Sequence, residues 1–281
     1  MTYLRERFGL PMAQACRVAL LPRSTGYYRP KPKRDETVIV ARMQALVDHH
    51  RSWGHPTIHD VLSREGLVVN RKRSWRLYRE AGLSLAVRKR KKRASRARLV
   101  LPTPERPDHR WAMDFLQDTL WTGRRFRMLA VLDLFTKECL AIEVDTSLSG
   151  LRVARALDWL VLTRGTPEAI TVDNGPEFAG RDMDRWAYAH HVSLDFIRPG
   201  KPIENAYIES FNGKFRHQCL NEHYFSTLEE AKHIIGRWRI HYNEFRPHSS
   251  LNGRTPKEFA TQWKENNNPN PEKVSLQPVQ T

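Results

Sequence analysis

The spacing of hydrophobic residues changes along the chain, from helical periods in the first part to strand-like alternation in the second. In the first part, Val40, Met43, Leu46 and Val47 recur three or four positions apart, which predicts a helix that begins at Thr37. The same spacing predicts further helices over residues 57–65 and 71–83, and a small helix-turn-helix within residues 9–28.

The helix expected over residues 71–83 has a basic face. Gly66 can supply the positive φ that ends the preceding helix, and Asn70 can cap the start of the next one. The basic residues of this helix are Arg71, Lys72, Arg73, Arg76 and Arg79. A short turn followed by a basic helix is typical of a helix-turn-helix that enters the DNA major groove. A three-helix bundle with a solvent-exposed basic face has the same pattern, so this segment alone leaves both interpretations open.

The second part of the chain is expected to form a mixed sheet covered by helices. Trp111, Met113 and Phe115 alternate along one face of a first strand, and two further strands over residues 126–135 and 138–146 follow short polar turns. The remaining expected elements are a helix over 150–164, a strand ending at Asp173, a helix over 181–191 and a strand from Ser193. Three strands followed by alternating helices and strands indicate an α/β domain.

The net charge of the chain indicates what kind of molecule it binds. The 281 residues have a formal net charge of +16, which favours a polyanion such as nucleic acid. Half of that charge comes from RKRKKRASRAR at residues 88–98, where eight of eleven residues are Lys or Arg. Prolines follow this run, so residues 86–106 are interpreted as an exposed basic linker that contacts phosphates; a merely solubilising charge run is the alternative.

Other classes of protein are disfavoured by composition. No apolar run approaches the roughly 20 residues of a membrane-spanning helix, and the N-terminus is too charged for a signal peptide, so a cytoplasmic protein is expected. The three cysteines are far apart, which argues against disulfides and against a cysteine-based zinc module.

Three acidic residues are candidates for one site. Asp114 lies in the first strand with parity opposite to its apolar neighbours, Asp173 ends a buried strand, and Glu209 borders the apolar stripe of a helix. Asp114 on a solvent face and Asp173 as the cap of its Asn-Gly-Pro turn are the structural alternatives. Between Asp173 and Glu209 lie 35 residues.

Four segments together resemble one family: WAMDF, VDNGPEF, PGKPIENAYIESFNGKFR and YNEFRPHSSLNGRTP. The resemblance is to the second-frame transposases of bacterial insertion sequences with two overlapping reading frames, members of the retroviral-integrase superfamily. It covers nearly the whole chain and implies an RNase H-like α/β core, with a mixed sheet flanked by helices, after a small all-α helix-turn-helix region. The D, D and E of that family, with 35 residues between the last two, correspond to Asp114, Asp173 and Glu209.

The resemblance implies a metal-dependent DNA transposase that cleaves element ends and transfers strands. The three carboxylates would hold two Mg²⁺ ions, for which Mn²⁺ can substitute, because hard cations prefer oxygen ligands. Asp133 and Glu177 lie close to this site in the sequence and are ranked below the three acids; each is interpreted either as a residue that supports the metal ligands or as a salt-bridge partner. The alternatives are a metal-dependent nuclease of the same fold and a helix-turn-helix regulator without catalysis, which would leave the three acids unexplained.

The predicted DNA contacts lie in the basic helix, in the basic linker and beside the acids. Outside the basic helix they are Arg88, Lys89, Arg90, Lys91, Lys92, Arg93, Lys201, Asn205 and Arg216. The expected partners are double-stranded DNA at element ends and target, further copies of the chain on that DNA, and an upstream-frame DNA-binding protein or fusion. The expected layout is a small helix-turn-helix segment (1–30), a DNA-binding region (36–85), the linker (86–106), a catalytic domain (107–265) and a disordered tail (266–281).

Overall fold

The computed structural model describes residues 2–28, 36–85, 103–197 and 206–267. The chain divides into two compact units, residues 1–38 and residues 39–281. Within the described residues, no helix is long and apolar enough to cross a membrane. The three cysteines are buried and unbridged, which agrees with the expected absence of disulfides.

The first unit contains three short helices, α1 (Thr2–Phe8), α2 (Met12–Val18) and α3 (Arg23–Gly26). The sequence predicted α2 and α3, where Ala15 and Cys16 of α2 are buried. Helix α1 was not predicted, because its seven residues have no buried apolar stripe; Tyr3 and Phe8 are both exposed and meet edge to face, 6.2 Å between ring centroids.

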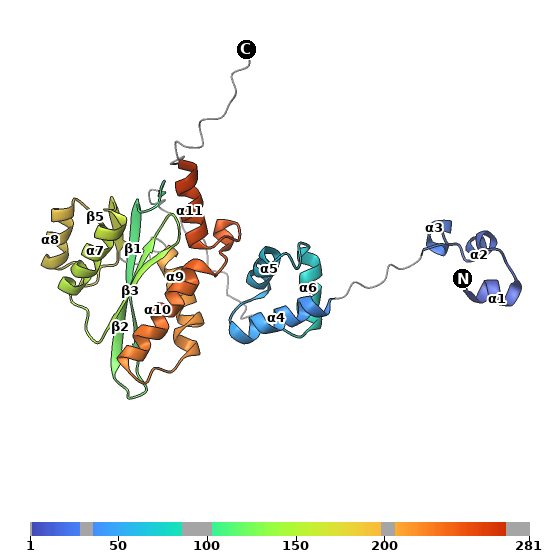
Figure 1. Ribbon diagram of the computed structural model, residues 1–281, viewed down its shortest axis with the longest axis horizontal. Coiled ribbons are helices and arrows are strands. Elements are labelled where there is room, and N and C mark those ends of the chain that lie inside the picture. The colour runs from blue at the N-terminus through green and yellow to red at the C-terminus, as the bar shows by residue number, and fades with distance from the viewer. Residues whose placement is uncertain (1, 29–35, 86–102, 198–205, 268–281) are drawn as a thin grey trace, which may run out of the picture. The chain divides into compact units, whose positions relative to one another are not determined.

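Helices α4 (Thr37–His49), α5 (His55–Arg64) and α6 (Arg71–Glu80) form the helix-turn-helix region (Figure 1). Met43, Ile58 and Leu62 are fully buried at its centre. Gly66 has a φ of +73°, and the Asn70 side chain accepts hydrogen bonds from the amides of Lys72 and Arg73 at 2.9 and 3.3 Å. Both local predictions, the glycine that ends one helix and the asparagine that caps the next, are therefore confirmed.

A mixed sheet of five strands, counted over the described residues, forms the centre of the following domain. Its strands are β1 (Arg110–Thr119), β2 (Arg125–Asp133), β3 (Cys139–Asp145), β4 (Ala169–Val172) and β5 (Ser193–Phe196). They lie in the order β3-β2-β1-β4-β5, with antiparallel pairs among the first three and parallel pairs from β1 to β5. The predicted meander and mixed sheet are thus observed.

Helices cover both faces of the sheet (Figure 1). Helices α7 (Gly150–Arg164) and α8 (Arg181–His190) pack on one face, and α9 (Ala206–Gln218) and α10 (Leu228–Glu244) pack on the other. Along β1, Trp111 and Met113 face α7 and α8, whereas Ala112 and Leu116 face α9 and α10. Alternate β1 residues therefore lie in different cores, and Asp114 has the parity of the α9 side.

The C-terminal part of the domain adds two short 3-10 helices and one α-helix. These are η2 (Leu220–Glu222), η3 (Ser249–Leu251) and α11 (Pro256–Asn267). Phe259 and Trp263 of α11 contact Phe135, which follows β2, with ring centroids 5.5 and 6.0 Å apart.

Candidate active site

Asp114 and Asp173 lie side by side because of strand register. Strands β1 and β4 are parallel neighbours in which Ala112 pairs with Thr171. Asp114 lies two residues beyond Ala112 and Asp173 two residues beyond Thr171, so the same register, continued past the end of β4, brings the two acids level on one face of the sheet. The charge of Asp173 acts on Asp114, which agrees with this placement. The turn at the end of β4 therefore places one acid beside the other.

The turn after β4 holds the Asp173 side chain. The Gly175 amide donates a hydrogen bond of 2.9 Å to Oδ1 of Asp173. A Cβ atom at Gly175 would lie 2.9 Å from the same oxygen, too close for any other residue without rearrangement. Asp173 thus does cap its own turn, as the structural interpretation predicted, and its second oxygen has no hydrogen-bond partner within the described residues.

Helix α9 brings Glu209 and Asn212 to the same face. Ile208, Phe211 and Phe215 anchor α9 in the core, which confirms the predicted stripe, while Glu209 is exposed beside it. Asn212 lies three residues beyond Glu209, and its Nδ2 donates a hydrogen bond of 2.7 Å to Oδ2 of Asp114. The other amide atom, Oδ1 of Asn212, is buried without a hydrogen-bond partner.

Asp114 is electrostatically coupled to the other two acids. Its pKa is raised to about 6; burial is the largest cause, and the charges of Asp173 and Glu209 add to it. Hydrogen bonds from the Phe115 amide, at 2.8 Å, and from Asn212 lower this pKa and so oppose those effects. A cation at this site would relieve the repulsion and favour the charged form.

None of the three acids forms an ion pair within the described part of the chain, whereas other carboxylates around the sheet do. Arginines pair with Asp145, Glu177 and Asp195. Within the same residues, no group of three or more Asp, Glu, His or Cys side chains is close enough together to hold a metal ion. The structure thus brings Asp114, Asp173 and Glu209 close enough for their charges to act on Asp114, without an ion-pair partner among the described residues and without forming a ready-made metal site there.

Asp133 and Glu177, the two other acids close to the site in the sequence, are held by hydrogen bonds or an ion pair with neighbouring residues. Asp133 is fully buried and accepts hydrogen bonds from the Thr136 hydroxyl, at 2.6 Å, and from neighbouring amides. Glu177 forms its ion pair with Arg127 of β2, which holds the pKa of Glu177 below its usual value. Neither carboxylate is available as a free ligand.

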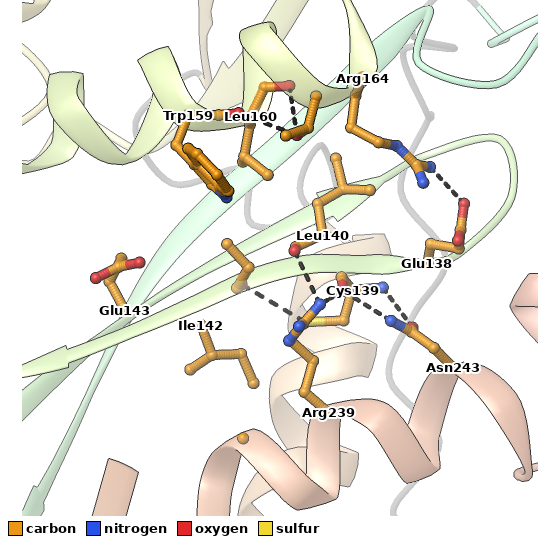
Figure 2. Close-up of a pocket in the computed structure, with 13 residues that line it drawn as sticks. Glu138, Cys139, Leu140, Ile142, Glu143, Trp159, Leu160, Arg164, Arg239 and Asn243 are labelled. Carbon is orange, nitrogen blue, oxygen red and sulfur yellow. Dashed lines mark hydrogen bonds and ion pairs between the residues drawn. The ribbon is translucent and has the colours of Figure 1, made fainter. Parts of the chain in front are cut away.

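A cavity of about 440 Å³ lies elsewhere, at the outer edge of β3 between α7 and α10 (Figure 2). Asn243 reaches from α10 to Cys139, accepting from its amide at 2.8 Å and donating to its carbonyl at 2.9 Å. Arg239 donates to the carbonyls of Cys139 and Leu140, at 3.3 and 3.0 Å, and Arg164 pairs with Glu138. These polar groups are occupied in holding β3, so the cavity is not the candidate site.

The structure describes some of the residues predicted to contact DNA, and the others lie outside the described residues. In α6, Arg71, Lys72, Arg76 and Arg79 are exposed, Arg73 is half-buried, and Arg76 pairs with Glu80 at 2.9 Å. Arg216 is exposed on α9, and its Nη2 donates to the Gln117 carbonyl at 3.3 Å. Lys201, Asn205 and the six basic linker residues from Arg88 to Arg93 lie outside the described residues.

The helix-turn-helix region and the sheet domain each match a known protein family. An HTH-like domain family matches residues 33–92, and two integrase core domain families match residues 104–202 and 190–256. The uncharacterized 31.7 kDa protein of insertion element IS407 from Burkholderia multivorans is 47% identical over 260 residues, which cover 92% of this chain and 94% of the relative. The chain belongs to the transposase family of bacterial insertion sequences.

More distant proteins also match most of the chain. A candidate transposase of IS150 from Escherichia coli is 26% identical, over 90% of this chain and 94% of its own. Among solved structures, the simian T-cell lymphotropic virus intasome in complex with a PP2A regulatory subunit matches with a TM-score of 0.51 at 13% identity, over 85% of this chain and 77% of that chain. The expected fold, an integrase-like core after a helix-turn-helix region, is therefore confirmed.

Sequence reasoning missed two residues that act beside the acids. Asn212 was not singled out, and its bond to Asp114, which spans 98 positions, was not predicted. Arg127 was not singled out, although a charged residue inside the apolar strand FRMLAVLD is a signal that a partner must be near.

Proposed function

We propose that this family member is a DNA transposase whose Asp114, Asp173 and Glu209 hold two Mg²⁺ ions, or Mn²⁺ in their place. The observation that carries the proposal is that three carboxylates from β1, from the end of β4 and from α9 are electrostatically coupled and lack cationic partners within the described residues. Such a donor set of oxygens alone fits a hard divalent cation. Asp173, which follows β4 beside β1, would be one of the residues that hold the ions, together with Asp114 and Glu209.

The residues of the chain position this site. Asn212 orients the Asp114 carboxylate, and the Gly175 amide fixes one oxygen of Asp173 while the other remains open. When bound, the metal ions would activate an oxygen nucleophile and stabilise the charge that develops on the phosphate. Water for end cleavage and a DNA 3′-hydroxyl for strand transfer are the proposed nucleophiles, so no protein side chain forms a covalent bond to DNA.

Binding of DNA is assigned to three basic groups. The exposed face of α6 is proposed to enter the major groove of the element end, because its exposed basic side chains can contact phosphates and base edges there. The basic linker and Lys201, Asn205 and Arg216 are proposed to contact phosphates. Several copies are proposed to act together on two element ends and a target, and an upstream-frame protein or fusion remains a proposed partner.

Two other functions make different predictions from the same site. A nuclease of this fold would cleave element ends but would not join them to target DNA. A regulator would bind DNA equally well with or without the three acids. Measuring cleavage and joining in one reaction separates all three.

The decisive experiment compares the wild type with Asp173→Asn, using labelled element ends and target DNA in Mg²⁺. Asparagine keeps the size of the side chain and its ability to cap the turn but removes a charge. DNA binding should be unchanged, whereas cleavage and strand transfer should fall by about three or more powers of ten.

Asp48→Asn, at an exposed position of α4, is the matched control and should keep full activity. Asp114→Asn combined with Asp173→Asn should be scarcely worse than either change alone, since the acids act as a unit. Joining of ends by Asp173→Asn at the wild-type rate would show that this acid only shapes the turn.

A further inference from the structure

The loop after Asp173 is fastened to the sheet on the face of α7 and α8. Glu177 forms an ion pair with Arg127 of β2. Phe178 is fully buried and stacks on Phe115 of β1, with ring centroids 4.9 Å apart and an interplanar angle of 20°. The Arg127 guanidinium lies over the same Phe115 ring, 4.4 Å from its centroid. These four residues, Phe115, Arg127, Glu177 and Phe178, are called the loop clamp.

The clamp is built on the strands that carry the first acid. Phe115 directly follows Asp114 and so faces the opposite side of β1. Phe115 pairs with Leu129 and Gln117 pairs with Arg127, which makes Phe115 and Arg127 diagonal neighbours on one face. Asp114 is therefore fixed to the same short piece of sheet that receives the loop.

Hydrogen bonds inside the loop connect the clamp to Asp173. The amides of Phe178 and Ala179 donate to the Gly175 carbonyl, both at 3.0 Å, and the Gly175 amide donates to Asp173 Oδ1 at 2.9 Å. A Cβ atom at Gly175 would lie 2.9 Å from Asp173 Oδ1 and 3.4 Å from Glu177 Oε2, so the glycine separates two carboxylates at close contact. Movement of residues 177–178 would therefore move the atom that holds Asp173.

The pair at the centre of the clamp is well shielded from water. The side chains of Arg127 and Glu177 are 26% and 20% exposed, and Nε of Arg127 is buried with no hydrogen-bond partner among the residues that the structure describes. Because the guanidinium has few other polar contacts, loss of Glu177 would leave a half-buried charge uncompensated. An exposed pair such as Lys257 and Glu244, at 60% and 48%, lacks this property.

We propose that Arg127 and Glu177 are positioning residues, which hold the loop so that Asp173 stays beside Asp114. This gives Glu177 a role distinct from that of a metal ligand. The catalytic consequence rests on the proposed transposase function, but the holding of the loop does not, so the two can be tested separately.

The first test measures amide hydrogen exchange of the full-length protein without DNA. Glu177→Gln keeps the size of the side chain and removes its charge, so the amides of Gly175, Phe178 and Ala179 should exchange about tenfold faster. Glu244→Gln, the matched control, should leave these amides unchanged. Unaltered exchange in Glu177→Gln overturns the proposal, whether or not the chain is a transposase.

The second test measures end cleavage against Mg²⁺ concentration. Glu177→Gln and Arg127→Gln should each raise the Mg²⁺ concentration at half-maximal rate by about tenfold, with a rate at saturating Mg²⁺ within about threefold of the wild type. The double variant should be no worse than either single one, because both remove the same contact. Loss of cleavage at every Mg²⁺ concentration in Glu177→Gln alone, with Arg127→Gln unaffected, would make Glu177 a ligand and overturn the proposal.

Wild-type protein is the reference for both tests. A wild type that fails to cleave element ends contradicts the proposed function, and the exchange measurement then still decides whether the clamp holds the loop. Additive losses in the double variant would show that Arg127 and Glu177 act independently, against the proposal.

Discussion

Asp114 is the residue at which burial and chemistry conflict most directly. Its pKa of about 6 means that the ionised carboxylate is destabilised in the folded protein, by burial and by the charges of two other acids. A group needed only for stability would be better replaced by a neutral one. An acid kept at such a position is expected where function requires its charge.

The loss of folding stability caused by the charge of Asp114 can be measured with Asp114→Asn. Because the folded-state pKa lies above the ordinary value of 3.8, the folded protein binds more protons than the unfolded chain between pH 4 and 6. The contribution of Asp114 to stability should therefore fall as pH rises through this window and stay constant above it. Asp114→Asn should raise the free energy of unfolding by about 1 to 3 kcal/mol at pH 7 to 8 and by little at pH 4.

Urea unfolding at both pH values, in buffer without divalent metal, checks this expectation. Asp48→Asn, which removes an acid at an exposed site, is the matched control. A stability difference between Asp114→Asn and wild type that is the same at both pH values would contradict the assignment of the pKa.

At the scale of elements, the start of α6 depends on a single side chain. Oδ1 of Asn70 accepts hydrogen bonds from two backbone amides that otherwise have no partner in the first turn. Asn70→Ala should lower the free energy of unfolding by about 1 kcal/mol, whereas Asn70→Asp, which keeps the acceptor, should retain the wild-type value. Chemical denaturation of the three proteins compares them, and equal decreases in both variants would refute the capping role.

Elements were predictable where their signals are local. Helix α7 was predicted over residues 150–164 and extends over Gly150–Arg164, because its apolar spacing and flanking residues lie within the segment itself. Helix α1 was missed because it has no buried face, so periodicity could not reveal it.

The candidate site was only partly predictable. Strand parity and a helix stripe located the three acids, but their catalytic role was carried by family resemblance and stays a prediction. The contacts of Arg127 with Glu177 and of Asn212 with Asp114 join residues 50 and 98 positions apart. The spacing of hydrophobic residues indicates which face of a strand or helix a residue occupies. Strand order and helix packing decide which other residue lies next to it on that face.

At the scale of the whole molecule, charge is concentrated in the linker. The segment RKRKKRASRAR provides +8 of the net +16, although its structure lies outside the described residues. Replacing its eight basic residues with Gln should weaken binding to DNA of every sequence. The slope of log K against log salt should become shallower by about 0.9 for each phosphate that the protein no longer neutralises.

Affinity measured between low and moderate salt, on element ends and on random DNA, checks this prediction. Asp173→Asn, which leaves the linker intact, should keep the wild-type slope. The same slope after removal of eight charges would mean that the linker does not contact phosphates.

Asn243 occupies backbone hydrogen-bonding groups of the edge strand β3. Its side-chain amide both accepts from and donates to Cys139, as a neighbouring strand would, and Arg239 occupies the next carbonyl. An incoming strand from another chain would have to displace these hydrogen bonds before it could pair with the N-terminal end of β3. This end of the edge strand is thereby protected against pairing with a strand of another molecule, a contact that leads to aggregation.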